Sequence, residues 1–521
     1  MDVKLFDTTL RDGAQTDGIS FSVEDKIKIA KLLDDIGIHY IEGGWPLSNP
    51  KDIEFFQKMK SIKLKNAKLV AFGSTARPNI PVEMDTNLLA LLDAETKVVA
   101  IFGKTWDFHV KNALKITLEE NLKLIEQSVR FLKSKKREVI FDAEHFFDGY
   151  KNNKSYAIAC IKAAVKGGAD VVALCDTNGG SLAFEVQKIV KEVKKKVKVT
   201  LGVHMHNDSE CAVSASCMAV YCGATHVQGT VNGYGERCGN ANLCSIIPIL
   251  KLKLGINCIS SSNLKKLTEV SRHVSEIANL PQSGRQSFVG RSAFSHKAGI
   301  HVNAILKHPA TYEHIEPALV GNERHLPVSE LSGVSTLIYK AKEFGVDLSH
   351  DKEKAKEILS MLKDMEHQGY QYEEGDASFE LFVRKALGLY KPFFKLEGFR
   401  TMSDTKESGK TTIEASIKIK VGEKVIHETA EGDGPVNALD SALRKALNDI
   451  YPAIKNIKLT DYKVRVLDSA DGTAAKVRVI IESSDEEKSW GTVGVSTNII
   501  EASWLALVDS IEYKLMSESE K

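Results

Sequence analysis

The sequence has no run of about 18 consecutive apolar residues, the length that a membrane-spanning helix needs. Its first residues, MDVKLFDTTL, lack the cationic start and the apolar centre of a secretory signal peptide. These two absences predict a cytoplasmic protein with no membrane partner.

An excess of one charge sign is also missing. The chain has 70 basic and 69 acidic residues, which leaves a formal net charge of +1. A balanced charge gives no electrostatic reason to expect binding to nucleic acid or to an anionic membrane, although a local patch could still hold a phosphorylated ligand. We therefore expect small-molecule partners and no nucleic acid.

Cysteines are few and confined to one part of the chain. All eight lie between Cys160 and Cys258, and no two form a CxxC pair. In a long chain without a secretory signal, this distribution is typical of buried small side chains and not of a disulfide framework.

What the sequence does contain is the alternation of an α/β protein. Between amphipathic helical segments such as SVEDKIKIAKLLDDIG, short apolar runs recur: VKLF, HYIEGG, KLVAFG, KVVAIFG, EVIFDAEHF, DVVALCDT, VTLGVHMHN and HVQGTVNG. Strands that alternate with helices form parallel sheets covered by helices. Eight such units in about 250 residues predict a (β/α)8 TIM barrel over residues 1–270.

Polar residues stand where these predicted strands end. In a barrel, the carboxyl ends of the strands and the loops after them form the catalytic face. The residues at these ends are Arg11, Asp12, Glu42, Asp142, Glu144, Asp176, Thr177, His204 and His206.

The second half of the chain has a different pattern. Residues 271–390 are first loop-rich and then helical, and we expect a linker region that completes the active site. Residues 391–521 contain two pairs of predicted strands, each followed by a helix. The segments GDGPVNALDSALRKAL and VGVSTNIIEASWLALV form a weak internal repeat, so we expect a separate, pseudo-symmetric α+β domain.

The motif HMHND is the most specific short signal. His204 and His206 are two residues apart on a predicted strand, so both imidazoles face the same side and can reach one ion. The alternative to a metal site is a pair of histidines that are held only by hydrogen bonds. Asp12 would lie close by in a closed barrel, which favours a metal site, and the loop NGYGERCGNAN adds Asn240 as an oxygen ligand, with Glu236 and Arg237 as a supporting pair.

The motifs DTTLRDGAQ, LCDTNGG, HMHND and GERCGNA occur in this order in the sequence. Together they resemble the family of isopropylmalate, homocitrate and citramalate synthases, which are acetyl-CoA-dependent condensing enzymes. The resemblance continues through SHKAGIHVNAILKHPATYEHI to EGDGPVNALDSAL and covers nearly the whole chain. Within the family, GGWPLSNPKD, FGKTWDFHV and DAEHFFDGYKNN are most similar to the long-form (R)-citramalate synthases, which accept pyruvate.

The resemblance implies roles for individual residues. Asp12, His204, His206 and Asn240 would bind a divalent cation, which could be Mn, Zn or Mg. Arg11 would stabilise the alkoxide formed during condensation.

Three residues match the positions from which the family removes the acetyl proton, namely Glu144, His301 and Tyr312. Which one is the base stays open, and a salt bridge is the structural alternative for Glu144. Thr177 would bind the substrate carboxylate. Phe102 and Asp142 would face the alkyl group of the 2-oxo acid.

For the C-terminal domain, the resemblance implies dimerisation and inhibition by an end-product amino acid. We expect this amino acid to be isoleucine, on a route from pyruvate to isoleucine. We expect the inhibitor near two glycine-rich helix starts, at Gly432 and Gly434 and at Gly491 and Gly494, because exposed N–H groups at a helix start suit a carboxylate.

The expected function is thus (R)-citramalate synthesis from acetyl-CoA and pyruvate by an acyltransferase. Three alternatives remain at this point. The 2-oxo acid could be that of a 2-isopropylmalate or homocitrate synthase, the protein could be a lyase of the same superfamily, or a degenerate barrel could act only as an amino-acid sensor.

Overall fold

The protein is described here from a computed structural model, in which residues 2–329, 332–405, 411–468, 472 and 474–520 are described. It divides into two compact units, Met1–Phe294 with Ile315–Arg324, and Ser295–His314 with His325–Lys521. None of the helices in the described ranges is long and apolar enough to cross a membrane. The three-part division expected from the sequence stays a prediction.

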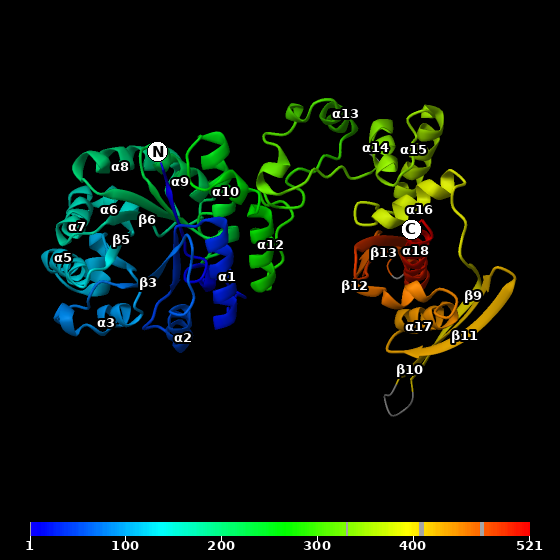
Figure 1. Cartoon of the computed structure of the whole chain (residues 1–521), viewed down its shortest axis with the longest axis horizontal. Coiled ribbons are helices and arrows are strands. Elements are labelled where there is room, and N and C mark those ends of the chain that lie inside the picture. The colour runs from blue at the N-terminus through cyan, green and yellow to red at the C-terminus, as the bar shows by residue number, and fades with distance from the viewer. Residues whose placement is uncertain (1, 330–331, 406–410, 469–471, 473, 521) are drawn as a thin grey trace. The chain divides into compact units, whose positions relative to one another are not determined.

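The first unit is a closed barrel of eight parallel strands, as predicted (Figure 1). The strands follow each other around the barrel in chain order, and β1 closes it by pairing with β8, with Leu5 opposite Val227. The strands are β1 (Lys4–Asp7), β2 (Tyr40–Gly44), β3 (Lys68–Ser74), β4 (Val98–Lys104), β5 (Glu138–Glu144), β6 (Val171–Asp176), β7 (Thr200–Met205) and β8 (His226–Gly229).

Helices connect the strands and cover the outside of the barrel (Figure 1). Two of them begin with a capping box, formed by Ser22 and Asp25 at the start of α1 and by Thr117 and Glu120 at the start of α5. The helices of this unit are α1 (Val23–Ile36), α2 (Pro50–Met59), α3 (Thr86–Asp93), α4 (Asp107–His109), α5 (Leu118–Ser134), α6 (Phe146–Asn152), α7 (Lys154–Gly167), α8 (Ala183–Lys196), α9 (Ala212–Tyr221), α10 (Leu243–Pro248), α11 (Ser261–Leu264) and α12 (Leu267–Ile277).

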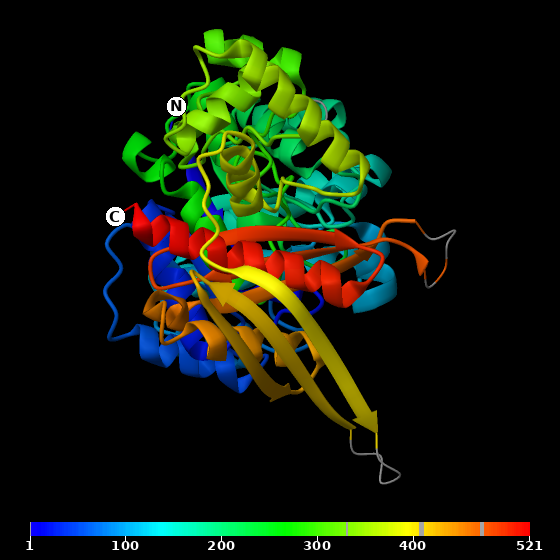
Figure 2. The same cartoon turned by 90° about the vertical axis from the view of Figure 1, so that its right-hand side faces the viewer.

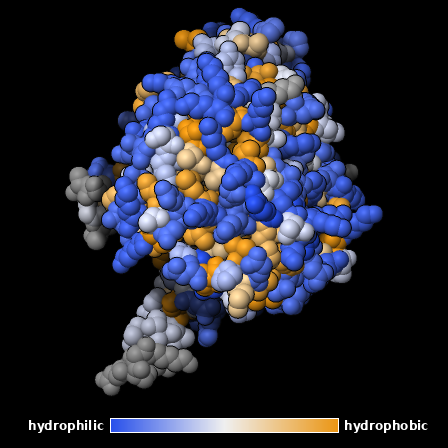
Figure 3. Space-filling view, turned by 90° about the vertical axis from the view of Figure 1, so that its left-hand side faces the viewer, coloured by the Kyte–Doolittle hydropathy of each residue, from blue (hydrophilic) through white to orange (hydrophobic). Residues whose placement is uncertain are grey.

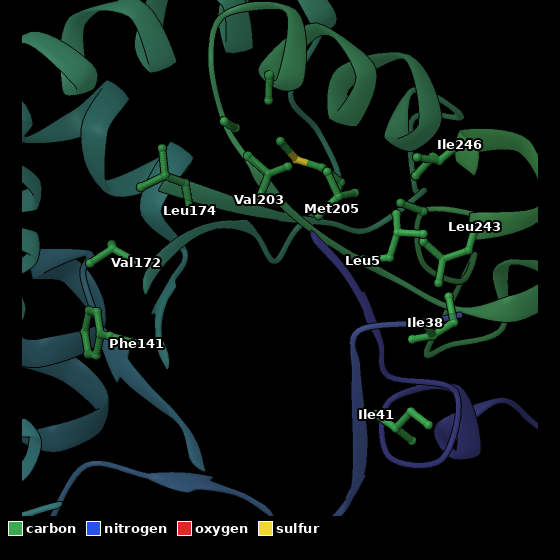
Figure 4. Close-up of a cluster of buried hydrophobic side chains, with 14 of the residues drawn as sticks. Leu5, Ile38, Ile41, Phe141, Val172, Leu174, Val203, Met205, Leu243 and Ile246 are labelled. Carbon is green, nitrogen blue, oxygen red and sulfur yellow. The ribbon is translucent and has the colours of Figure 1, made fainter. Parts of the chain in front are cut away.

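The barrel has an inner and an outer apolar layer. Alternate residues of a strand point to opposite faces, so Phe6 belongs to the cluster inside the barrel while Leu5 packs against the helices outside. Val203 and Met205 of β7 also belong to the outer cluster, part of which Figure 4 shows. His204, between them, therefore faces the lumen.

Most cysteines contribute to these layers, and all eight are free thiols, as expected from their distribution. Six are buried, Cys211 is partly buried and Cys238 is exposed. The face of the molecule in Figure 3 is mostly hydrophilic, with hydrophobic side chains scattered between the polar ones.

Within its described residues, the second unit contains six helices and two three-stranded antiparallel sheets, and each sheet is followed by a long helix. Helix α17 packs on β10 and β11, and α18 packs on β13 and β14 (Figure 2). The helices are α13 (Gly299–Lys307), α14 (Val334–Glu343), α15 (Lys352–His367), α16 (Asp376–Ala386), α17 (Pro435–Leu447) and α18 (Ile499–Ser519). The strands are β9 (Lys395–Thr405), β10 (Thr411–Val421), β11 (Lys424–Gly432), β12 (Lys458–Val466), β13 (Val477–Ser484) and β14 (Ser489–Ser496), in the orders β11-β10-β9 and β12-β13-β14.

The expected pseudo-symmetric α+β domain is present, but each half has three strands and not two. Strand β9 is not predicted from the sequence because KLEGFRTMSDT is mostly exposed and carries few β-branched residues. Strand β14 is not predicted because SWGTVGVS is glycine-rich and resembles a loop before a helix.

Candidate functional site

A pocket of about 240 Å³ opens at the carboxyl ends of the barrel strands. This is the face on which the sequence placed the polar strand ends. The pocket is lined by Arg11, Asp12, Gln15, Trp45, Phe72, Phe102, Asp142, Glu144, Cys175, Thr177, His204, His206, Glu236 and Arg237.

Three of these side chains converge at the pocket floor. Asp12 Oδ2 lies 3.2 Å from His204 Nε2 and 3.8 Å from His206 Nε2, and the two histidine Nε2 atoms are 3.3 Å apart. All three residues are buried, and their donor atoms are close enough together to hold one metal ion. The predicted convergence of strands β1 and β7 is therefore observed.

Asn240 lies beside this triad. The backbone of Asn240 pairs with that of His206 in an isolated antiparallel bridge. Its side-chain nitrogen donates to the carbonyl oxygen of Tyr234 at 3.2 Å. Its Oδ1 atom is buried and has no hydrogen bond among the described residues, which suits a ligand oxygen. The glycine-rich loop packs tightly here: at Gly235, with φ +155°, a Cβ atom would approach Asn240 Nδ2 to 2.2 Å.

The donor set fits a divalent cation. Two imidazole nitrogens with carboxylate and amide oxygens form the mixed set that borderline metals accept. The structure does not select one metal. Divalent metal binding thus agrees with both the geometry and the orphaned oxygen of Asn240.

The electrostatics of the triad also favour a cation. Burial opposes the charge on Asp12, but Arg11 and the two histidines outweigh it and hold the pKa of Asp12 well below its usual value. Burial, with the neighbouring His204, lowers the pKa of His206 to about 4. For His204, burial is outweighed by the hydrogen bond and charge of Asp12, so its pKa is raised. At neutral pH Asp12 is therefore ionised and His206 neutral, the forms in which both bind metals.

Arg11 is held in a fixed position at the edge of the triad. Its Nε donates to Glu42 Oε1 at 2.5 Å, its NH1 lies 3.5 Å from Asp12, and its guanidinium carbon lies 3.7 Å from the centroid of the Phe72 ring. Thr8 also donates to Glu42 Oε1, at 2.6 Å. The sequence marked Glu42 as a polar strand end but did not assign it to the site, because its only signal was a carboxylate inside an apolar strand.

Glu144 and Thr177, at the ends of β5 and β6, also line the pocket. The carboxylate of Glu144 forms an ion pair with Lys104, with 2.5 Å between Oε2 and Nζ. The hydroxyl of Thr177 accepts the backbone N–H of His145 at 2.9 Å. Because this contact uses an acceptor position, the hydroxyl hydrogen of Thr177 remains able to donate to a ligand.

An aromatic group forms the wall at the ends of β2, β3 and β4. The ring of Phe102 stacks on Phe72, with centroids 5.5 Å apart and planes at 22°. Trp45 stands edge-on to Phe102, with centroids 5.8 Å apart. The sequence analysis singled out Phe102 but not Trp45 or Phe72, since one aromatic residue in a strand end does not reveal which others it meets.

Asp142 lies in the same pocket but is almost completely buried. It accepts a hydrogen bond from Gln228 Nε2 at 2.8 Å, and burial, with the nearby Glu42, raises its pKa to about 7. Gln228 was not among the predicted site residues.

Arg237 binds mainly to a partner other than the expected Glu236. It makes two hydrogen bonds with Asp208, at 2.7 and 2.9 Å, and one with the carbonyl oxygen of Thr177, at 2.7 Å. Its distance to Glu236 is 3.7 Å. Arg237 thereby ties the loop after β8 to the loops after β6 and β7.

His301 and Tyr312 belong to the second unit and lie close to each other. His301 is in α13, and its ring centroid is 4.1 Å from that of Tyr312, which is 46% exposed. Their catalytic roles stay predictions.

The four glycines of the expected regulatory site differ in position. Gly432 ends β11 and Gly434 is the N-cap of α17, as expected for a helix start. Gly491 and Gly494 instead lie inside β14, and α18 begins later, at Ile499. A Cβ atom at Gly494 would approach the carbonyl oxygen of Ala502 to 2.1 Å, so close packing of strand on helix accounts for this glycine.

Comparisons with known proteins cover the chain from end to end. Family models match the HMGL-like family at residues 2–274, the homocitrate synthase post-HMGL domain-like family at 288–370, and the LeuA allosteric (dimerisation) domain at 373–515. Among solved structures, an HMG-CoA lyase from Bacillus subtilis aligns with 54% of this chain and 95% of its own, at 19% identity and a TM-score of 0.47.

Curated relatives of high identity share one name. Proteins called (R)-citramalate synthase from Geobacter sulfurreducens and Aquifex aeolicus are 56% and 54% identical to this chain, over 99% and 100% of it and over 98% and 99% of their own lengths. A third, from Synechocystis, is 50% identical over 98% of this chain and 96% of its own length.

Proposed function

Because the chain belongs to the (R)-citramalate synthase family, we propose that it condenses acetyl-CoA with pyruvate and hydrolyses the thioester to (R)-citramalate and CoA. The observation that carries this proposal is the convergence of Asp12, His204 and His206 beside Arg11 in the barrel pocket. A degenerate, non-catalytic barrel would have no reason to keep these groups buried together.

In the proposed reaction, a base removes a proton from the acetyl methyl group, and the resulting carbon attacks the ketone carbon of pyruvate. The ketone oxygen becomes an alkoxide and then, on protonation, a hydroxyl. Water then attacks the thioester carbonyl, which releases CoA as the thiol and leaves a carboxylate.

We assign the charge-stabilising role to Arg11. Its guanidinium stays cationic at every working pH, and Glu42 fixes its direction through the 2.5 Å hydrogen bond. The cation held by Asp12, His204, His206 and Asn240 would act as a Lewis acid toward the ketone. Mn, Zn and Mg all remain candidates for that cation.

We assign substrate binding to Thr177 and the base to the group of Glu144, His301 and Tyr312. The free hydroxyl hydrogen of Thr177 suits the carboxylate of pyruvate. Glu144 lines the pocket and is paired with Lys104, so it can serve as a base only if that ion pair opens.

We propose that the aromatic wall selects pyruvate. Phe102, stacked on Phe72 and edge-on to Trp45, leaves room for a methyl group and opposes an isopropyl group. Asp142 lies beside this wall and lines the same pocket.

For the second unit we propose dimerisation and inhibition by isoleucine, on a route from pyruvate to that amino acid. The match to the LeuA allosteric (dimerisation) domain supports both properties. Gly434 is the favoured contact for the carboxylate of the inhibitor, since a Cβ atom there would meet nothing within 4 Å and α17 starts directly after it. The eight free thiols support a cytoplasmic, reducing location.

Product analysis tests the proposed reaction. The purified protein, supplied with a divalent cation, acetyl-CoA and pyruvate, should form (R)-citramalate and CoA in equal amounts, as followed by chiral chromatography and thiol release. CoA release without citramalate would refute the condensation and leave only a thioesterase.

A further inference from the structure

Gln228, on β8, connects two parts of the site that the sequence treated separately. Its Oε1 lies 2.8 Å from His204 Nδ1, and its Nε2 lies 2.8 Å from Asp142 Oδ1. The side chain is completely buried. One amide thus contacts a candidate metal ligand on β7 and a pocket residue on β5.

The barrel is built to allow this contact. His204 and Gln228 are directly paired neighbours on β7 and β8, whereas Asp142 lies three strands away from Gln228. The row of paired residues that starts at Asp142 passes through Ala173 and Gly202, which have little or no side chain, and ends on β8 at His226, two residues before Gln228. At Gly202 a Cβ atom would approach the His226 ring to 2.7 Å, so this layer has no room for a larger residue.

The chemistry of the two neighbours determines how the amide is turned. An ionised carboxylate only accepts hydrogen bonds, so Asp142 requires the NH2 end of the amide. The oxygen end must then face His204 and accept its Nδ1–H. A neutral imidazole protonated on Nδ1 has its lone pair on Nε2, and Nε2 is the atom that faces Asp12 and His206.

We propose that Gln228 is a positioning residue, which fixes the tautomer of His204 for cation binding and at the same time holds the Asp142 carboxylate in the wall of the pocket. This inference rests on the proposed function in that it takes His204 Nε2 as a cation ligand. In this role Gln228 does not contact the substrate.

Two substitutions separate this role from simple packing. Gln228→Leu removes both polar contacts and should weaken cation binding about 10- to 100-fold, the usual effect of losing such a hydrogen bond to a metal ligand. Gln228→Glu should restore nearly normal cation binding, because two carboxyl groups in contact share one proton even above their ordinary pKa, so the contact with Asp142 is kept while the other glutamic acid oxygen accepts from His204.

Asn121→Leu is the matched control. Asn121 is equally buried and also makes two amide contacts, with the carbonyl oxygen of Lys104 and the hydroxyl of Tyr156. Neither of these contacts involves Asp12, His204 or His206. Its substitution should lower stability and leave cation affinity unchanged.

The probe is Mn²⁺ alone, with free Mn²⁺ counted by electron paramagnetic resonance at about pH 8, which is above the pKa of about 7 to which burial raises Asp142. The proposal predicts weak binding by Gln228→Leu, rescue by Gln228→Glu, and normal binding by Asn121→Leu. A folded Gln228→Leu protein that binds Mn²⁺ as tightly as the wild type would overturn it, as would a failure of the wild type to bind Mn²⁺.

If Gln228→Leu does not fold, Gln228→Met makes the same test with an unbranched side chain of similar length. Because no substrate is present, the outcome does not depend on the proposed reaction. A wild type that binds Mn²⁺ but does not convert pyruvate would refute the proposed function and leave the comparison of variants intact.

Discussion

Replacing Phe102 with alanine should move the substrate preference from pyruvate toward larger 2-oxo acids. The Phe102 ring lies on Phe72, and Trp45 closes its edge, so its removal opens space at the point where the alkyl group of the substrate is expected. The substrate 2-oxoisovalerate has two more carbon atoms than pyruvate. Each carbon newly buried is worth about 0.8 kcal/mol, or about 1.6 kcal/mol in total. The ratio of kcat/KM for 2-oxoisovalerate to that for pyruvate should therefore rise about 15-fold.

The assay is thiol release from acetyl-CoA with each acid in turn, using the wild type, Phe102→Ala and the control Phe108→Ala. Phe108 is 54% exposed and does not line the pocket, so its loss should leave the ratio unchanged. Thermal unfolding would confirm that Phe102→Ala is folded. An unchanged ratio in a folded, metal-loaded Phe102→Ala protein would refute the pocket argument.

Other predictions test separate parts of the site. Asp12→Ala should abolish bound metal, measured by elemental analysis, together with activity, and retained activity would contradict the metal site. Glu144→Gln should keep the metal and slow condensation about 10²- to 10⁴-fold, whereas an unchanged rate would leave Glu144 only its ion pair with Lys104. Burial raises the pKa of Asp142 to about 7, so this residue binds its proton more tightly in the folded than in the unfolded protein. The free energy of unfolding should therefore fall as the pH rises from about 4 to about 7. Asp142→Asn should flatten that slope in urea titrations of the metal-free protein. Gly434→Asp should place a carboxylate where the inhibitor's carboxylate would bind and abolish isoleucine inhibition at unchanged basal rate; equal inhibition would move the inhibitor site elsewhere.

The barrel could be predicted from sequence because its signal is local and repeated. Each short apolar run, such as VKLF, marks one strand. Because a helical segment lies between successive runs, the strands are expected to pair in parallel. The same periodicity placed His204 and His206 on one face, and chain order alone brought Asp12 next to them.

The remaining contacts could not be predicted because they depend on the third dimension. Gln228 is one polar residue in an apolar strand, and nothing near it in the sequence indicates that it reaches Asp142 across the lumen. Glu42 was noticed as a strand end, but its bond to Arg11 depends on how β1 and the loop after it turn.

The second unit shows where local patterns mislead. Gly491 and Gly494 looked like a helix start by analogy with the first half of the repeat. They are strand residues because α16 and α18 pack closely on β14, with the N–H of Gly491 donating to Asp376. Close packing and a ligand-binding helix start both favour glycine, so the sequence alone did not separate them.

The measurement that tests the central claim most directly is kcat/KM for pyruvate, 2-oxoisovalerate and 2-oxoglutarate in parallel, with the wild-type protein, acetyl-CoA and a divalent cation. The account predicts that pyruvate is clearly preferred and that removal of the cation by a chelator stops CoA release with all three acids. A preference for either of the other acids, or full activity after chelation, would contradict it.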